Sequence, residues 1–221
     1  MKSIFTNLLL HILFYPLPKM TISKKEENLF NNLLENSLKR PDKTIDYKLA
    51  IPKYKFLYYA TKQKSFVLHG SNNKYIDSFE PRKQTLYNGK WTTAVFATKD
   101  PIWPIFYAIF NKEKIVGNMR NGSVSANGKK PFHFYSLTKP TLQNEPWTNG
   151  MIYLLQEDSF RHISQGTIQF DEWISDEAIE PIAKIEVEPD DFYFLNKVAT
   201  HRSDESVMKA WLFYKIRSLL V

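Results

Sequence analysis

Residues 102–110 are apolar on nearly every side, and a soluble protein accommodates such a helix only inside a core. Asp100-Pro101 marks where the helix starts. An aspartate accepts hydrogen bonds from the first free N–H groups of a helix, and a proline at the first helical position sacrifices no hydrogen bond. The sequence therefore predicts a helix that begins after Asp100 and is covered by other elements on all sides.

Strand-like runs lie on both sides of this helix in the sequence. Residues 65–68 and 94–98 precede it, and later runs occupy residues 132–137, 151–155, 167–173 and 182–187. Residues 117–130 contain two Asn-Gly pairs and predict a turn-rich loop or the rim of a hairpin. Strands and helices do not alternate regularly, so the order of elements argues against a doubly wound fold. The order predicts an α+β fold with a split, mainly antiparallel sheet and flanking helices.

Three amphipathic segments supply the flanking helices. Ser23 and Glu26 have the spacing of a capping box, and apolar residues follow at helical intervals until Pro41 stops the pattern. Residues 47–60 fit a second helix and residues 204–220 fit a C-terminal one. We expect the first two helices to pack on the domain from outside.

The chain of 221 residues is long enough for one core, and no second core is required. We expect residues 20–62 to be a helical N-terminal appendage and residues 63–221 to form the main domain with its C-terminal helix. Residues 1–19 lack the cleavage site of a signal peptide and are too short and polar for a membrane span. We expect this segment to be either a disordered extension or a stretch upstream of a true start at Met20.

The composition excludes several kinds of site. The chain has no cysteine, which removes disulfides, thiol catalysis and cysteine-containing zinc sites. Its five histidines show no paired spacing, so we expect no metal site. Scattered basic residues give a formal charge of +7 and favour anionic partners such as nucleotides, nucleic acids or acidic proteins. We expect a cytoplasmic monomer without a membrane partner, with a secreted effector as the alternative location.

Three short segments that lie far apart in the sequence carry chemically useful side chains. His69-Gly70-Ser71 closes the first predicted strand. Tyr107 lies on the buried helix, and Glu172 lies near the end of a later strand. An aromatic face stacks on a flat heterocycle, and a carboxylate stabilises the positive charge that develops when a glycosidic bond breaks. Together the segments predict chemistry at a glycosidic bond of a nucleotide.

These segments, in this order and in strand, strand–helix and strand contexts, resemble the His, Tyr and Glu motifs of the ADP-ribosyltransferase superfamily. The resemblance is to the branch of diphtheria toxin and the poly(ADP-ribose) polymerases, and it covers about residues 65–190. It implies an ADP-ribosyltransferase-like split antiparallel sheet. It also implies an enzyme that cleaves the nicotinamide–ribose bond of NAD, its substrate, and transfers ADP-ribose to a protein, a nucleic acid or water.

The resemblance assigns binding roles to the first two motifs. His69 would hydrogen-bond the adenosine ribose, while the backbone of Gly70 would approach the nicotinamide carboxamide and Ser71 would shape the same strand end. Tyr107 would stack on the nicotinamide ring. Phe106 is the alternative stacking residue, because a shift of the helix by one residue exchanges the two.

By the same resemblance, Glu172 is the catalytic residue and would hold the ribose 2′-hydroxyl. Arg82, in the loop after the first motif, would pair with the diphosphate. The chain has Trp103-Pro104 where polymerase-like members carry a small polar residue. Three alternatives remain: a non-catalytic domain that binds ADP-ribose, NAD or a partner; an RNA 2′-phosphotransferase, for which a second motif histidine is missing; and a structural domain in which the motifs do not converge.

Overall fold

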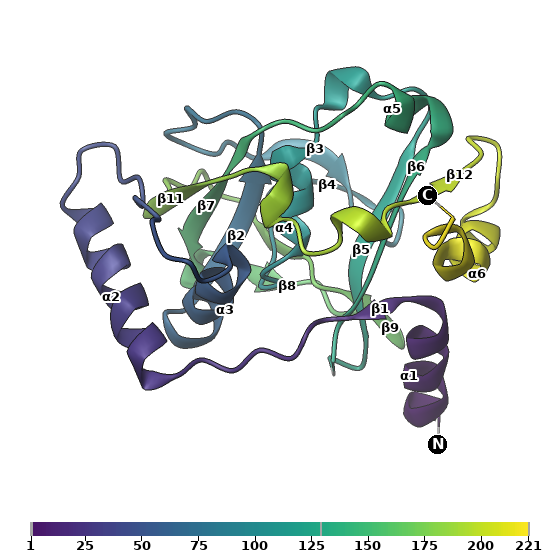
Figure 1. Cartoon of the computed structure of the whole chain (residues 1–221), viewed down its shortest axis with the longest axis horizontal. Helices are drawn as coiled ribbons and strands as arrows, with labels where there is room; N and C mark the ends of the chain where they lie inside the picture. The colour runs from purple at the N-terminus through teal and green to yellow at the C-terminus, as the bar shows by residue number, and fades with distance from the viewer. Residues whose placement is uncertain (1, 129, 221) are drawn as a thin grey trace.

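The computed structural model describes residues 2–128 and 130–220. Its α-helices are α1 (Lys2–Leu13), α2 (Lys24–Leu38), α3 (Lys53–Gln63), α4 (Trp103–Ile109), α5 (Lys139–Gln143) and α6 (Val207–Arg217). Its strands are β1 (Tyr15–Pro16), β2 (Phe66–Ser71), β3 (Arg82–Thr85), β4 (Trp91–Ala97), β5 (Met119–Ala126), β6 (Phe132–Thr138), β7 (Gly150–Gln156), β8 (Arg161–His162), β9 (Ile168–Phe170), β10 (Trp173–Ser175), β11 (Ala183–Val187) and β12 (Ala199–His201). Figure 1 shows how they are arranged.

The strands form three sheets with the orders β11-β7-β2, β3-β4-β10-β8 and β1-β6-β5-β9, and β12 adds to the last beside β6. Only the pairing of β12 with β6 is parallel among the described strands. Leu68 of β2 and Thr98, just after β4, exchange backbone hydrogen bonds of 2.8 and 3.0 Å and so join the first two sheets. The predicted α+β class with mainly antiparallel sheets is confirmed.

Helix α4 is buried in the centre, as its sequence predicts, and it packs unusually closely on β2 and β7. A Cβ atom added to Gly70 would lie 1.8 Å from the carbonyl oxygen of Pro104, and one added to Gly150 would lie 1.9 Å from that of Ala108. Both obstacles are backbone atoms of α4. The two glycines, on neighbouring strands, therefore allow the helix backbone to contact the sheet backbone.

The capping prediction at the start of α4 is right in its chemistry and wrong in its position. Asp100 Oδ1 accepts hydrogen bonds from the N–H groups of Ile102 and Trp103, both at 2.8 Å. Its other oxygen accepts one from the Ser123 hydroxyl at 2.7 Å. The helix begins only at Trp103, so Pro101 precedes it. Asp100 thus ties the helix start to β5.

The N-terminal segment is part of the fold rather than the expected disordered extension. Leu10 and Phe14 are buried against β5 and β6, and Tyr15 of β1 pairs with His133 of β6. The alternation of apolar and polar residues was too irregular to predict this packing. None of the described helices is long and apolar enough to cross a membrane.

Helices α2 and α3 cover the other side of the molecule, where they join the main hydrophobic core. The predicted capping box is present: Glu26 N–H donates to Ser23 Oγ at 3.2 Å and Ser23 N–H donates to Glu26 Oε2 at 2.8 Å. Helix α3 starts at Lys53, later than the expected residue 47. Pro52 explains the delay, because the residue before a proline is disfavoured in helical geometry.

Of the two alternatives for residues 117–130, the loop is wrong, because most of the segment is strand β5, and the hairpin is confirmed, because β5 pairs with β6. Gly122 lies inside the strand because a Cβ there would meet an aromatic ring of β9 at 2.5 Å. The chain turns only at Asn127-Gly128, whose φ angles of 53° and 68° fit a hairpin turn. Lys129 lies outside the described residues.

We predict that Gly150→Ala destabilises the fold by more than about 3 kcal/mol, because its Cβ would displace the backbone of α4. Gly89→Asn is the matched control, since nothing lies within 4 Å of a Cβ at that turn. It should cost about 1 kcal/mol. Urea denaturation measures both, and equal losses in the two variants would contradict the close-packing account.

Candidate functional site

One pocket gathers the three sequence motifs. It has a volume of about 190 Å³ and lies between β2, β4, α4 and the junction of β9 with β10. Its lining residues are Leu68, His69, Gly70, Gln84, Thr85, Phe96, Ala97, Thr98, Trp103, Pro104, Tyr107, Lys112 and Glu172. Four of the seven residues expected from the sequence therefore line one cavity: His69, Gly70, Tyr107 and Glu172.

His69 is held in one tautomer by the neighbouring strand. Its Nδ1 lies 2.6 Å from the backbone oxygen of Phe96, so Nδ1 must be the donor. Burial lowers the pKa of the imidazole, the Phe96 carbonyl opposes this effect, and the positive charges of Lys112 and Arg82 add to it. The ring is therefore neutral at neutral pH, which makes Nε2 a hydrogen-bond acceptor.

The other two residues of the first motif have structural explanations. The side of Gly70 where a Cβ would lie is filled by α4, so the close approach that requires glycine is to a helix. Its backbone still lines the pocket. Ser71 is not among the lining residues, and its Oγ accepts a hydrogen bond from Asn73 N–H at 3.1 Å. It caps the turn that follows β2.

The structure distinguishes the two candidate stacking residues. Phe106 is fully buried and stacks on Phe110, with ring centroids 5.4 Å apart, so it belongs to the core. Tyr107 is the one residue of α4 that is not buried, and it lines the pocket. Burial and the charge of Glu172 raise the pKa of Tyr107 to about 12, against a hydrogen bond to Asn121 that lowers it. Tyr107 thus stays a neutral phenol.

Two further aromatic side chains line the pocket with Tyr107. Trp103 occupies the helix turn before it and donates from Nε1 to Asn121 Oδ1 at 2.6 Å. The Trp103 and Tyr107 rings are tilted, with centroids 6.2 Å apart. Phe96 of β4 also contributes to the lining. The pocket therefore offers several aromatic faces to a flat ligand.

Glu172 lies where the chain passes from one sheet to another. The predicted strand at residues 167–173 is in fact two strands, because β9 pairs with β5 whereas β10 pairs with β4. Asp171 anchors the crossing: its Oδ2 accepts hydrogen bonds from Thr98 Oγ1 and Lys99 N–H, both at 2.8 Å. The next side chain, that of Glu172, lines the pocket.

The environment of Glu172 favours its protonated form. Burial raises the pKa of this carboxyl to about 7, although a hydrogen bond from Tyr87 N–H to Oε2, 3.1 Å long, lowers it in part. Glu172 therefore keeps its proton to a higher pH than an exposed glutamate does. A buried carboxyl with a strongly raised pKa in a cleft is typical of a functional site, although structural groups show such shifts as well.

Tyr87, whose N–H donates to Glu172, is held in place by contacts of its own side chain, here called the Tyr87 clasp. The sequence did not predict these contacts. The Tyr87 hydroxyl donates to the Gln165 backbone oxygen at 2.6 Å and accepts from Gln165 N–H at 3.0 Å. The Tyr87 ring stacks on Phe170 with centroids 5.0 Å apart. The turn between β3 and β4 is thereby fixed to the loop before β9, on the approach to Glu172.

Two basic residues lie near the pocket. Arg82 is exposed at the start of β3, on the same strand face as the pocket residue Gln84. It is not a lining residue, but its charge acts on His69. Lys112, which the sequence analysis missed, lines the pocket, and its Nζ lies 5.9 Å from the centroid of the Tyr107 ring. It lies in a short 3₁₀ turn after α4, where no periodic pattern marks it.

Comparisons with known proteins give no family. No protein-family model matches the chain, and neither the curated proteins nor the solved structures contain a match. Within residues 2–128 and 130–220, no group of three or more histidine, aspartate or glutamate residues could hold a metal ion.

We predict that Glu172→Gln becomes more stable than the unchanged chain as the pH rises. The folded carboxyl titrates at about 7 instead of 4.5, so the folded state keeps a proton that the unfolded chain releases between those values. Stability is lost across that window, and glutamine avoids the loss. The advantage of the variant should grow from about pH 5 to about pH 8, reaching about 1 to 2 kcal/mol.

Urea denaturation at several pH values measures this difference. Glu177→Gln, which removes an exposed carboxylate from the segment after β10, is the matched control for the loss of one charge. A pH-independent difference for Glu172→Gln would show that Glu172 ionises in the folded protein as it does in the unfolded chain.

Proposed function

We propose that the chain is an NAD-dependent ADP-ribosyltransferase-like enzyme. The observation that carries the proposal is the convergence of His69, Tyr107 and Glu172, from three distant segments, on one pocket. Coincidental motifs have no reason to meet in this way. The order of the motifs and their places on a strand end, a buried helix and a strand junction also agree with the resemblance described above.

The reaction would be a substitution at the ribose carbon that carries nicotinamide. The glycosidic bond breaks with its electron pair staying on the ring nitrogen, so nicotinamide leaves as a neutral molecule. An oxygen or nitrogen of the acceptor, or of water, bonds to that carbon and loses its proton. Positive charge develops on the ribose between these events, and the Glu172 carboxylate stabilises it by accepting a hydrogen bond from the 2′-hydroxyl.

The pocket suits one end of the dinucleotide. Its volume of about 190 Å³ is below the roughly 300–1,000 Å³ of sites that enclose whole drug-sized ligands. In the proposal, the nicotinamide ring stacks on Tyr107, and the neutral His69 accepts a hydrogen bond from a ribose hydroxyl. Lys112 and Arg82 lie near enough to attract the diphosphate, and the adenine extends outside the pocket, beyond the adenosine ribose that His69 contacts.

We predict that the rate of nicotinamide release rises with pH and levels off above about pH 7, because only the Glu172 carboxylate stabilises the transition state. Glu172→Gln should lower the rate by about a hundredfold to a thousandfold and remove this pH dependence, while NAD binding is kept. The measurement is the release of labelled nicotinamide from NAD. Absence of release from the unchanged chain, together with absence of NAD binding, would overturn the proposal.

We predict that Tyr107→Ala weakens NAD binding by about tenfold, because it removes stacking worth roughly 0.5 to 1.5 kcal/mol and the attraction of the cationic ring to the aromatic face. Tyr107→Phe should bind almost as well as the unchanged chain. Calorimetric titration measures both affinities. Equal losses for alanine and phenylalanine would assign the contribution to the hydroxyl and contradict stacking.

A second candidate is a non-catalytic domain that binds ADP-ribose or NAD. The observation in its favour is that burial raises the pKa of Glu172 to about 7, because the protonated carboxyl cannot stabilise a cationic transition state. NAD binding without nicotinamide release, unchanged in Glu172→Gln, would identify this function. An RNA 2′-phosphotransferase is less well supported, because the described lining contains one histidine and no arginine. We propose that the reaction takes place in the cytoplasm, with a secreted effector as the alternative.

A further inference from the structure

Most of the large apolar side chains that the described residues expose lie at one end of the molecule, on α1 and on or just after α6. On α1 they include Ile4, Phe5, Leu8 and Ile12, of which Phe5 is 70% exposed. Soluble proteins rarely expose contiguous apolar surface of this kind unless it binds something. This end of the molecule lies outside the pocket described above.

On α6 the exposed residues Met208, Leu212 and Ile216 follow one another at intervals of four. Leu219 and Leu220 continue this row just after the helix, and Val207 and Phe213 are exposed beside it. Residues at this spacing share one face of a helix. Both helices therefore carry an apolar row on the side that is turned away from the protein.

The two rows face in a common direction because both helices cover the same face of one sheet. Phe14, directly after α1, stacks on Phe134 of β6 with centroids 4.8 Å apart, and Trp211 of α6 contacts the same ring at 5.4 Å. Each helix buries the side opposite its exposed row. In Figure 1, α1 and α6 both lie to the right of β5 and β6, while α4 lies on the left.

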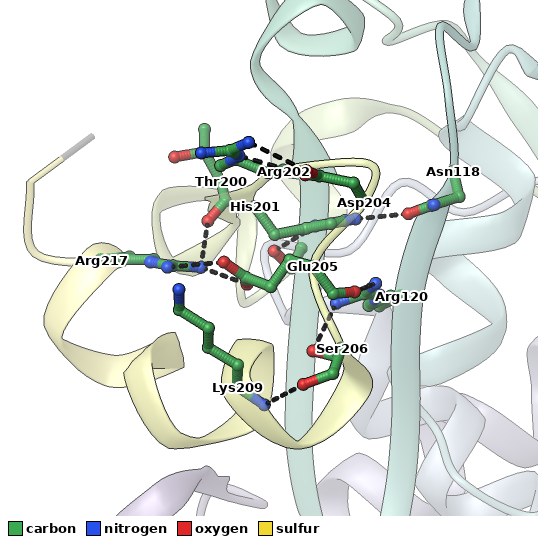
Figure 2. Close-up of polar contacts among 11 residues, drawn as sticks. Asn118, Arg120, Thr200, His201, Arg202, Asp204, Glu205, Ser206, Lys209 and Arg217 are labelled. Atoms are coloured by element: carbon green, nitrogen blue, oxygen red, sulfur yellow. Dashed lines mark hydrogen bonds and ion pairs between the residues drawn. The ribbon is translucent and has the colours of Figure 1, made fainter.

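The orientation of α6 is fixed by polar contacts of the residues just before its first turn and at its last residue, which Figure 2 shows. Arg217 makes two hydrogen bonds to the Glu205 carboxylate, at 2.6 and 2.9 Å. Arg120 of β5 donates to the backbone oxygens of Glu205 and Ser206, just before the helix. The apolar row is therefore not free to turn inward.

Helices α1 and α6 themselves contain no acidic residue. No aspartate or glutamate occurs in residues 1–25 or 206–221, whereas α6 contains Lys209, Lys215 and Arg217. The acidic residues next to α6 are already paired, Glu205 with Arg217 and Asp204 with Arg202. Two copies of the chain that met through this face would bring like charges together, which disfavours a dimer.

We propose that α1 and α6 form a docking surface for an anionic lipid bilayer. Apolar rows flanked only by basic residues are typical of helices that lie in the membrane interface. The exposed Lys209 would lie among the headgroups while the apolar side chains enter the acyl region, whereas the Lys215 ammonium stays 2.6 Å from the His11 backbone oxygen. The helices, of 12 and 11 residues, are too short to span the bilayer. The pocket lies beyond the other face of the β5–β6 sheet and stays accessible, so this inference is independent of the proposed function.

The test is co-sedimentation of the full chain with vesicles of phosphatidylcholine, with and without about 30% phosphatidylserine. Binding to the anionic vesicles should exceed binding to the neutral ones by at least tenfold and should weaken at high salt. The double variant Leu212→Glu/Ile216→Glu should bind at least tenfold less. Both side chains are exposed, at 62% and 59%, so the substitutions do not disturb the core.

The matched control is Tyr75→Glu/Trp91→Glu, which replaces two exposed aromatic residues away from α1 and α6. It should bind vesicles like the unchanged chain. Equal binding to anionic and neutral vesicles, equal loss in both double variants, or no vesicle binding at all would overturn the proposal. Analytical ultracentrifugation without lipid supplies a further readout: a dimer that Leu212→Glu/Ile216→Glu abolishes would assign the surface to a second copy of the chain.

Discussion

The contact between the backbone of α4 and the backbones of β2 and β7 determines the rest of the site. It exists only because Gly70 and Gly150 lack side chains, and any Cβ there would overlap a carbonyl oxygen of the helix. With the helix so close, Tyr107 lies beside the strand end that carries His69. Asp100 completes the arrangement by holding the start of the helix to β5. The pocket is thus a consequence of backbone packing, and its aromatic lining is set before any ligand arrives.

The Glu172 carboxyl lies in this pocket because the chain passes from one sheet to another at this residue. The chain leaves the β5 sheet after β9 and joins β4 at β10, and Asp171 is hydrogen-bonded at the crossing to Thr98 and Lys99. Glu172 is left between the sheets, where burial raises its pKa. A carboxyl held in this way is costly to ionise. Binding of a cationic nicotinamide ring beside it would favour ionisation, so ligand and carboxylate stabilise each other in the proposed mechanism.

Local patterns predicted much of the fold. The all-round apolar segment identified α4 as buried, and the capping box at Ser23 and Glu26 placed α2 to within a residue. Local patterns failed where tertiary contacts determine the structure. Gly122 resembles a turn residue, but it lies in a strand and leaves space for an aromatic ring of β9. Residues 167–173 resemble one strand, but they belong to two strands in different sheets. In the site, the sequence identified His69, Tyr107 and Glu172, but Lys112 and the Tyr87 clasp depend on which loops meet in space, which no local spacing encodes.

The central claim is that the nicotinamide end of NAD occupies the pocket between His69, Tyr107 and Glu172. A crystal structure of the chain with a non-hydrolysable NAD analogue tests it most directly. The account predicts the nicotinamide ring stacked on Tyr107, with centroids about 4.5 to 7 Å apart, and a ribose 2′-hydroxyl within hydrogen-bond distance of the Glu172 carboxylate. An analogue bound elsewhere, or bound with its adenine in this pocket, would contradict it.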